Sequence, residues 1–324
     1  MSGRPTVVVT RRLPGVVEEE LSRDFDAKLN RDDRPLGPAG LQEALRTADA
    51  LLCTVTDKLT ADVLSAEPLR ARMLANFGVG FNHIDTAAAK ERGLAVSNTP
   101  DVLTEATADI AITLLLMVSR RAGEGERHVR CGAWTGWRPT HMMGTQVSGK
   151  TLGLIGMGRI ARAMAKRAHH GFGMRVIFHD PYPPSAAEAA ALGAEPRPEL
   201  EQVLGEADFV SLHCPAMPET HHLMNRERLA LMRRSAFLIN TARGDVVDEA
   251  ALVQALGDGT IAGAGLDVYE REPQITPALL TMENVVLFPH LGSATHETRI
   301  AMGMRALENL RLFFDGAPLR DRVV

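Results

Sequence analysis

Three short motifs, each following a predicted strand, contain an arginine, a glutamate and a histidine of the kinds used in acid–base chemistry. They are Asn240-Thr-Ala-Arg243-Gly-Asp, Gly265-Leu-Asp-Val-Tyr-Glu-Arg-Glu272-Pro and Pro289-His290-Leu-Gly-Ser-Ala-Thr. Arg243 can hold a carboxylate or a keto oxygen with its charged fork. His290 can transfer a proton at a carbonyl oxygen while Glu272 holds its other ring nitrogen. The three motifs therefore predict a site that interconverts a carbonyl group and an alcohol.

The elements that must position these side chains are parallel strands. In an open α/β sheet, ligands bind in the crevice outside the carboxyl ends of the strands, so Arg243, Glu272 and His290 can converge there. Strands and helical patterns alternate along most of the chain, which predicts parallel sheets with helices on both faces. The predicted strands are Thr6–Thr10, Leu51–Val55, Met73–Phe77, Leu94–Ser97, Thr151–Ile155, Arg175–Asp180, Asp208–Cys214, Ala236–Thr241, Gly263–Val268 and Val285–Phe288.

The segment from Thr151 to Ala161 sets an apolar strand against a glycine-rich turn and then a helical pattern. Gly156 permits the tight turn, Gly158 lets the backbone approach a pyrophosphate, and Ala161 lies where the helix packs on the strand. The start of that helix offers unpaired N–H groups to phosphates. We therefore predict a dinucleotide site.

Asp180 ends the next predicted strand and bears on the choice of cofactor. Its carboxylate can accept hydrogen bonds from the adenosine ribose of NAD, whereas it would repel the 2′-phosphate of NADP. The residues that follow, Pro181-Tyr-Pro-Pro184, include no arginine that could bind that phosphate. NAD is therefore favoured over NADP, although a strand-end aspartate can also simply cap a turn.

Taken together, these motifs resemble the D-isomer-specific 2-hydroxyacid dehydrogenases over essentially the whole chain, and most closely the glyoxylate/hydroxypyruvate reductase branch. The resemblance makes Arg243 the substrate-binding arginine, His290 the acid/base and Glu272 its carboxylate partner. It implies cofactor contacts at Gly156, Gly158, Arg159, Ile160, Asp180, Cys214, Pro215, Thr220, Thr241, Ala242, Asp267, Gly292 and Thr107.

The family also places the substrate carboxylate on backbone amides of a glycine loop, here Asn76-Phe-Gly78-Val79-Gly80. Successive N–H groups in such a loop form an anion nest, although an ordinary strand-end turn is the alternative. We therefore expect Gly78, Val79 and Gly80 to bind substrate together with Arg243 and His290.

The resemblance further implies two doubly wound α/β domains, with a Rossmann nucleotide-binding domain inserted into a flavodoxin-like substrate-binding domain. The expected boundaries are 1–98 with 294–324 for the substrate domain and 99–293 for the NAD domain, including a dimerisation arm at about 119–150. Both tryptophans, Trp134 and Trp137, lie in this irregular arm. Large aromatics there suggest a homodimer interface, and a small core under a long loop is the alternative.

Several activities fit this framework. Reduction of glyoxylate or hydroxypyruvate to the D-2-hydroxy acid is the first expectation, with D-3-phosphoglycerate or another D-2-hydroxy acid as alternatives. A chain ending at Val324 leaves no room for the C-terminal regulatory domain of many phosphoglycerate dehydrogenases. Formate dehydrogenases carry Gln where Glu272 stands. The same fold also serves non-catalytic NAD-sensing proteins, which are a further alternative.

Composition points away from other classes of function. Of 324 residues, 45% are hydrophobic and the net charge is −4, with scattered basic residues, so we expect no nucleic-acid partner. The three cysteines and the histidines show no metal spacing, and we expect a reducing, cytoplasmic compartment. The longest apolar segment, Ile110–Val118, is too short to span a membrane, and the N-terminus lacks a signal-peptide pattern.

Overall fold

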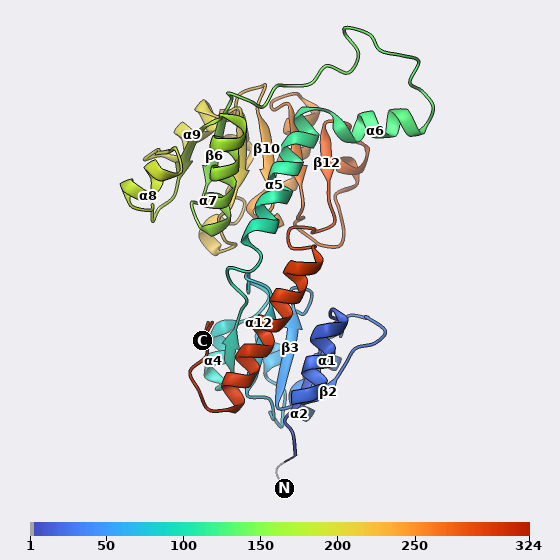
Figure 1. Ribbon diagram of the computed structural model, residues 1–324, viewed down its shortest axis with the longest axis vertical. Helices are drawn as coiled ribbons and strands as arrows, with labels where there is room; N and C mark the ends of the chain where they lie inside the picture. The colour runs from blue at the N-terminus through green and yellow to red at the C-terminus, as the bar shows by residue number, and fades with distance from the viewer. Residues whose placement is uncertain (1–2) are drawn as a thin grey trace. The chain divides into compact units, whose positions relative to one another are not determined.

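The computed structural model describes residues 3–324 and divides the chain into two compact units. The first unit contains the chain up to Leu103 together with Ser293–Val324, and the second is Thr104–Gly292. Figure 1 shows each unit as strands enclosed by helices. None of the helices among residues 3–324 is long and apolar enough to cross a membrane.

The first unit is built on a five-stranded sheet with the order β2-β1-β3-β4-β5, and every pair is parallel. This is the strand order of flavodoxin-like folds. Its strands are β1 (Thr6–Val9), β2 (Asp26–Lys28), β3 (Ala50–Thr54), β4 (Met73–Phe77) and β5 (Ala95–Ser97). Its helices are α1 (Gly15–Asp24), α2 (Pro38–Thr47), α3 (Ala61–Leu64), α4 (Thr86–Glu91) and α12 (His296–Phe314).

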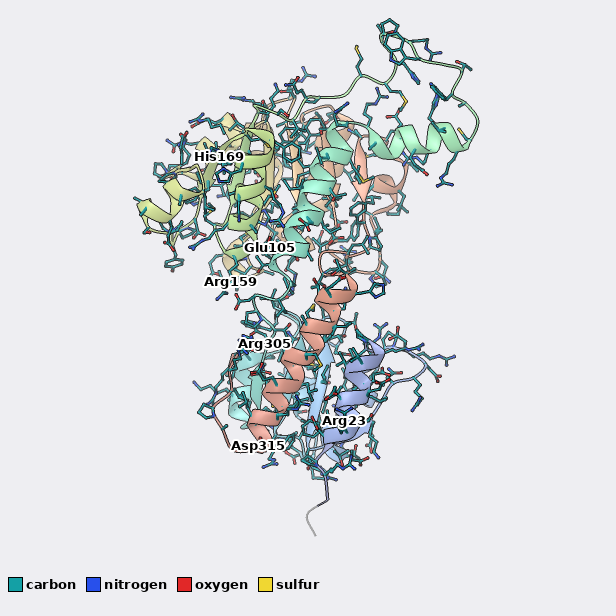
Figure 2. All side chains as sticks on the ribbon, in the orientation of Figure 1. Arg23, Glu105, Arg159, His169, Arg305 and Asp315 are labelled. Carbon is teal, nitrogen blue, oxygen red and sulfur yellow. The ribbon has the colours of Figure 1, made fainter. Side chains whose placement is uncertain are left out.

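Local sequence explains where the helices of this unit begin and end. The Asp85 side chain caps α4 by accepting a hydrogen bond from the Ala88 amide at 2.9 Å, and Gly93 follows the helix with a φ of +71°. A capping aspartate and a terminating glycine thus fix the two ends of α4. α12 packs against β4 and α1, and its Arg305, labelled in Figure 2, pairs with Asp321 at 2.6 Å.

The second unit has a seven-stranded parallel sheet with the order β12-β11-β10-β9-β6-β7-β8. Counted from β6, six of these strands follow the 3-2-1-4-5-6 order of dinucleotide-binding folds, which places the switch in strand order between β6 and β9. The strands are β6 (Thr151–Ile155), β7 (Arg175–His179), β8 (Ala194–Pro196), β9 (Phe209–Leu212), β10 (Phe237–Asn240), β11 (Gly263–Leu266) and β12 (Val285–Leu287).

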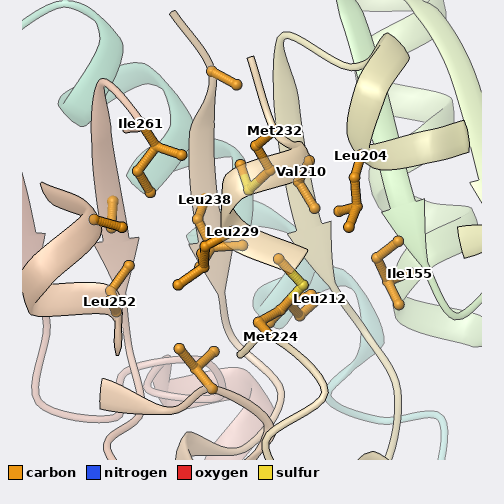
Figure 3. Packing of buried hydrophobic residues seen from close by; sticks show 14 of the residues in the cluster. Ile155, Leu204, Val210, Leu212, Met224, Leu229, Met232, Leu238, Leu252 and Ile261 are labelled. Carbon is orange, nitrogen blue, oxygen red and sulfur yellow. The ribbon is translucent and has the colours of Figure 1, made fainter. Parts of the chain in front are cut away.

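Helices cover both faces of this sheet. The α-helices are α5 (Thr104–Ser119), α6 (Ala122–Arg130), α7 (Arg159–Lys166), α8 (Ala186–Ala191), α9 (Leu200–Glu206), α10 (Arg226–Leu231) and α11 (Glu249–Gly257). α5 and α7 share one apolar cluster, whereas α9, α10 and α11 share another, part of which Figure 3 shows. The predicted fold class, two parallel α/β sheets, is confirmed.

Two short strands, β2 and β8, were not predicted from the sequence. β2 (Asp-Ala-Lys) and β8 (Ala-Glu-Pro) lie at sheet edges, and two of the three residues in each are exposed, so neither shows an apolar run. A third irregularity follows α7, where Arg167–Gly171 forms a π-helical turn. Such a turn accommodates one extra residue, and it contains the adjacent histidines His169 and His170.

Candidate active site

The glycine turn after β6 has the geometry that a dinucleotide requires. Gly156 has a φ of +88°, and a Cβ there would lie 2.9 Å from the Cys214 amide nitrogen, so only glycine fits. At Gly158, by contrast, no atom lies within 4 Å of the Cβ position. Open space at the start of α7, beside Arg159 (labelled in Figure 2) and Ile160, is what a pyrophosphate would need.

Asp180 lies just beyond β7 with a fixed carboxylate. One oxygen accepts a hydrogen bond from the Met157 amide at 2.6 Å, and the other accepts one from the Tyr182 amide at 2.7 Å. Each carboxylate oxygen keeps a second lone pair. The side chain is therefore anchored to the glycine turn and can still accept hydrogen bonds from ribose hydroxyls.

The remaining predicted cofactor residues line the carboxyl ends of neighbouring strands. Cys214 and Pro215 follow β9, and burial raises the pKa of the Cys214 thiol to about 11, so the thiol is neutral. The Thr220 hydroxyl donates to the Pro215 carbonyl at 2.6 Å and so shapes the loop. After β10, Thr241 and Ala242 follow, and the buried Thr241 hydroxyl has no protein partner among the described residues. An unpartnered buried hydroxyl fits a site that a cofactor completes.

Glu272 and His290 form the pair that the sequence predicts. The Glu272 carboxylate lies 2.9 Å from Nδ1 of His290, and its other oxygen accepts the Tyr269 amide at 3.0 Å. Burial acts to raise the pKa of Glu272, but His290, the Tyr269 amide and Arg243 outweigh it and lower the pKa. The carboxylate is therefore ionised and can only accept, so Nδ1 of His290 donates and Nε2 is left for another partner.

Arg243 follows β10 at the start of a short 3-10 turn, η3 (Gly244–Val246). Its guanidinium donates to the Ala242 carbonyl at 2.7 Å and lies close enough to Glu272 to feel that charge. Burial lowers the pKa of Arg243, while Glu272 and Asp245 oppose the shift. Arginine stays protonated in proteins, so Arg243 places a fixed positive charge beside the histidine–glutamate pair.

Asp267 organises the loop that carries His290. Its carboxylate accepts the Leu291 amide at 2.6 Å and the Gly292 amide at 2.7 Å, and its carbonyl accepts the His290 amide at 2.9 Å. His290 has a φ of +56°, a conformation that non-glycine residues seldom adopt and that clusters at functional sites. A Cβ at Gly292 would come within 3.3 Å of both Asp267 and Thr107, so the loop packs tightly against α5.

The expected substrate loop belongs to the first unit and follows β4. Side-chain amides bind the carbonyl groups of Gly78, Val79 and Gly80. Asn76 Nδ2 donates to the carbonyls of Gly78 and Gly80 at 3.0 Å, and Asn98 Nδ2 donates to the carbonyl of Val79 at 2.8 Å. Within residues 3–324, the amides of Val79 and Gly80 have no acceptor. Free N–H groups beside tied-back carbonyls are the arrangement of an anion nest.

One histidine pair and two contacts near the candidate site have no counterpart in the sequence motifs. Adjacent side chains on a regular helix or strand point apart, but the rings of His221 and His222 stack with centroids 4.0 Å apart, because His222 lies in a turn with a φ of +49°. Gly244 packs its backbone directly on the Tyr269–Glu270 peptide, and buried Glu249 accepts the Glu270 amide at 2.7 Å. Gly244 lies in the motif that begins at Asn240, but that motif does not indicate a contact with Tyr269, and Glu249 belongs to none of the three motifs. Among the residues that the structure describes, no cluster of His, Cys, Asp and Glu is suited to a metal.

Comparison with known proteins identifies the family. The family model described as "D-isomer specific 2-hydroxyacid dehydrogenase, NAD binding domain" matches residues 112–292. A curated glyoxylate reductase of Korarchaeum cryptofilum is 46% identical over 316 residues, which cover 97% of this chain and 94% of that protein. The chain belongs to the D-isomer-specific 2-hydroxyacid dehydrogenase family.

Solved structures of related proteins agree with this family. A Thermus thermophilus protein is 44% identical with a TM-score of 0.91, covering 98% of this chain and 100% of that one. An NADPH-dependent glyoxylate/hydroxypyruvate reductase of Sinorhizobium meliloti was solved with NADP and malonate. It is 36% identical with a TM-score of 0.88, and the match covers 99% of this chain and 97% of that one. This 2-hydroxyacid dehydrogenase is thus an oxidoreductase that uses a pyridine nucleotide.

Proposed function

We propose that this dehydrogenase uses NADH to reduce a small 2-oxo acid, glyoxylate or hydroxypyruvate, to the D-2-hydroxy acid. The observation that carries the proposal is the His290–Glu272 pair at 2.9 Å, with the Arg243 charge beside it. The glyoxylate reductases among its relatives support the choice of substrate.

The chain's own residues account for binding and proton transfer. Arg243 holds the substrate carboxylate or keto oxygen and stabilises the negative charge that develops on that oxygen. NADH, when bound, supplies the hydride to the carbonyl carbon. His290 then gives the proton on Nε2 to the resulting alkoxide, while ionised Glu272 holds Nδ1 and stabilises the imidazolium.

This proton transfer predicts opposite pH dependences for the two directions. Reduction requires the imidazolium of His290 as the proton donor. Oxidation of the hydroxy acid requires the neutral imidazole as a base, so the rates of the two directions should respond to pH in opposite senses. The Val79 and Gly80 amides are proposed to bind the substrate carboxylate.

The preference for NAD over NADP rests on Asp180. A 2′-phosphate would meet the Asp180 carboxylate, which the Met157 and Tyr182 amides hold in place. The Arg162 guanidinium is already bound to the Met157 carbonyl at 3.1 Å and to Glu188 at 3.3 Å. The Sinorhizobium meliloti structure contains NADP, so NADPH is the alternative that must be tested.

We also propose that the protein is a homodimer that uses the arm. Trp134 and Trp137 are 54% and 81% exposed, so they do not form the small core that was the alternative. A groove of about 320 Å³ runs between α5, α6 and the segment 279–288, and apolar Met117, Leu279 and Leu280 help to line it. Exposed aromatic side chains such as these tryptophans are typical of an interface.

A panel of 2-oxo acids assayed with NADH and with NADPH tests the proposed activity. We expect the highest kcat/KM for glyoxylate or hydroxypyruvate with NADH. A clear preference for 3-phosphohydroxypyruvate would favour the phosphoglycerate alternative, and a preference for NADPH would refute the role given to Asp180.

A further inference from the structure

The loop that carries Arg243 and the loop that carries Glu272 contact each other through residues other than these two. Gly244 lies against the Tyr269–Glu270 peptide so closely that a Cβ would be 1.9 Å from the Tyr269 carbonyl carbon. His222, whose amide donates to the Asp245 carbonyl at 2.8 Å, reaches Glu270 with Nε2 at 3.2 Å. The loops therefore meet along the peptide that precedes Glu272.

Glu249 is the buried member of this junction. It is the first residue of α11, is 5% exposed, and follows Asp248, which caps the helix by accepting the Ala251 amide at 3.0 Å. One carboxylate oxygen of Glu249 accepts the Glu270 amide at 2.7 Å, and the other accepts the Thr276 hydroxyl. The two hydrogen-bond partners of Glu249 therefore lie on either side of Glu272 in the sequence.

Helix stabilisation alone does not account for this arrangement. A first-turn glutamate stabilises a helix from the surface by interacting with the N-terminal dipole. Burying a carboxylate costs free energy unless its hydrogen bonds compensate, and the Glu249 oxygens bind the 270–276 segment. The position therefore fits a residue that holds this segment in place.

We propose that Glu249 is a positioning residue of the reaction: by holding the Glu270 amide, it fixes the 269–272 turn and so sets Glu272 against His290. The proposal rests on the catalytic roles given to Glu272 and His290 above. The turn is short, and Glu272 bonds back to its first amide at Tyr269, so a shift at Glu270 moves the carboxylate directly. Glu249 itself touches neither ring nitrogen of His290.

Three variants separate positioning from simple stability. Glu249→Ala removes both acceptors, and we expect kcat for reduction to fall about 10- to 100-fold, as for a misplacement of up to about 1 Å. Glu249→Gln keeps a carbonyl oxygen for the Glu270 amide, so we expect it to stay within about threefold of wild type. Ser185→Ala removes the cap of α8, which follows β7 towards the opposite edge of the sheet, and serves as the stability control.

The pH profile and the KM for NADH show whether Glu249→Ala acts through the Glu272–His290 pair or through stability. Glu249→Ala should move the upper pH limit of reduction to lower pH, because a loosened carboxylate holds the imidazolium less well. Its KM for NADH should stay within about twofold of wild type. Ser185→Ala should leave the pH limit unchanged even if its melting temperature falls as much.

A double-mutant cycle decides the question. If Glu249 acts through Glu272, then adding Glu249→Ala to Glu272→Ala should cost less than about twofold more. Independent, multiplicative losses would overturn the inference, as would a Glu249→Ala enzyme with wild-type kcat and pH profile. If Glu249→Ala does not fold, Thr276→Val releases one carboxylate oxygen and should show a smaller loss that also vanishes in the Glu272→Ala background.

The same cycle distinguishes this inference from the proposed function. A Glu272→Ala enzyme with wild-type rate and pH profile would refute the catalytic assignment itself. A strongly impaired Glu272→Ala enzyme with multiplicative losses would leave that assignment standing and refute only the role of Glu249.

Discussion

Adding one methyl group at Gly244 tests whether the two catalytic loops must touch. The new Cβ would lie 1.9 Å from the Tyr269 carbonyl carbon, 2.0 Å from its oxygen and 2.3 Å from the Glu270 nitrogen. Ordinary contact begins at 3.4 Å, so the loops of Gly244→Ala would have to separate by about 1.5 Å, the difference between 3.4 and 1.9. Backbone on both sides leaves no flexible side chain to absorb the shift.

The expected cost follows from that displacement. A misplacement of about 1 Å at reacting groups can lower a rate about 100-fold, so we expect Gly244→Ala to lose at least about 100-fold in kcat. That loss corresponds to about 2.7 kcal/mol of transition-state free energy. Overpacking should also lower the free energy of unfolding by about 1–3 kcal/mol.

Steady-state reduction of glyoxylate with NADH, together with urea unfolding, measures both effects. Gly205→Ala is the matched control: it lies in α9, and no atom lies within 4 Å of its Cβ position. This control should keep wild-type kcat and gain about 0.4–1 kcal/mol of stability. A Gly244→Ala enzyme with kcat within about threefold of wild type would refute the argument that this contact sets the site.

Three further predictions follow from other parts of the molecule. The double variant Asp180→Ser, Pro181→Arg should raise the NADPH/NADH ratio of kcat/KM by at least about tenfold, or about 1.4 kcal/mol; an unchanged ratio would remove Asp180 as the determinant. Replacing Trp134 and Trp137 by Ala should weaken the dimer in sedimentation velocity, and a monomeric wild type at micromolar concentration would contradict the proposed interface. Burial lowers the pKa of His213 from 6.5 to about 4. Between pH 6.5 and pH 4 the unfolded chain therefore binds a proton that the folded protein does not, and about 2–3 kcal/mol of the free energy of unfolding should be lost as pH falls through this range. His213→Gln should lose less over this range, and equal acid loss in both proteins would refute this account.

Much of the fold could be predicted because its parts have strong local signals. The apolar runs at Met73–Phe77 and Thr151–Ile155 are buried strands, as predicted, and α4 begins at a capping aspartate. Such signals arise from backbone geometry and from burial on both faces of a sheet. β2 and β8 lack them, because Asp26, Lys28, Glu195 and Pro196 are exposed and polar or lack an amide hydrogen, which leaves no apolar run to recognise.

The contact between Glu272 and His290 could be predicted from the sequence, but the contacts that support these two residues could not. The structure brings Glu272 and His290 together as the motifs indicate, because both motifs follow strands of one sheet. Glu249 and Gly244 could not be found in the same way, since their contacts join segments more than 20 residues apart. The turn that stacks His221 on His222 depends on a positive φ that the sequence does not specify.

The most direct test of the central claim is the stereochemistry and the His290 dependence of hydroxypyruvate reduction. Wild-type enzyme with NADH should produce D-glycerate alone, as judged by chiral chromatography of the product. His290→Ala should reduce kcat by about 100- to 10,000-fold, the usual contribution of a general acid. Formation of L-glycerate, or a His290→Ala enzyme that keeps most of its activity, would contradict the account.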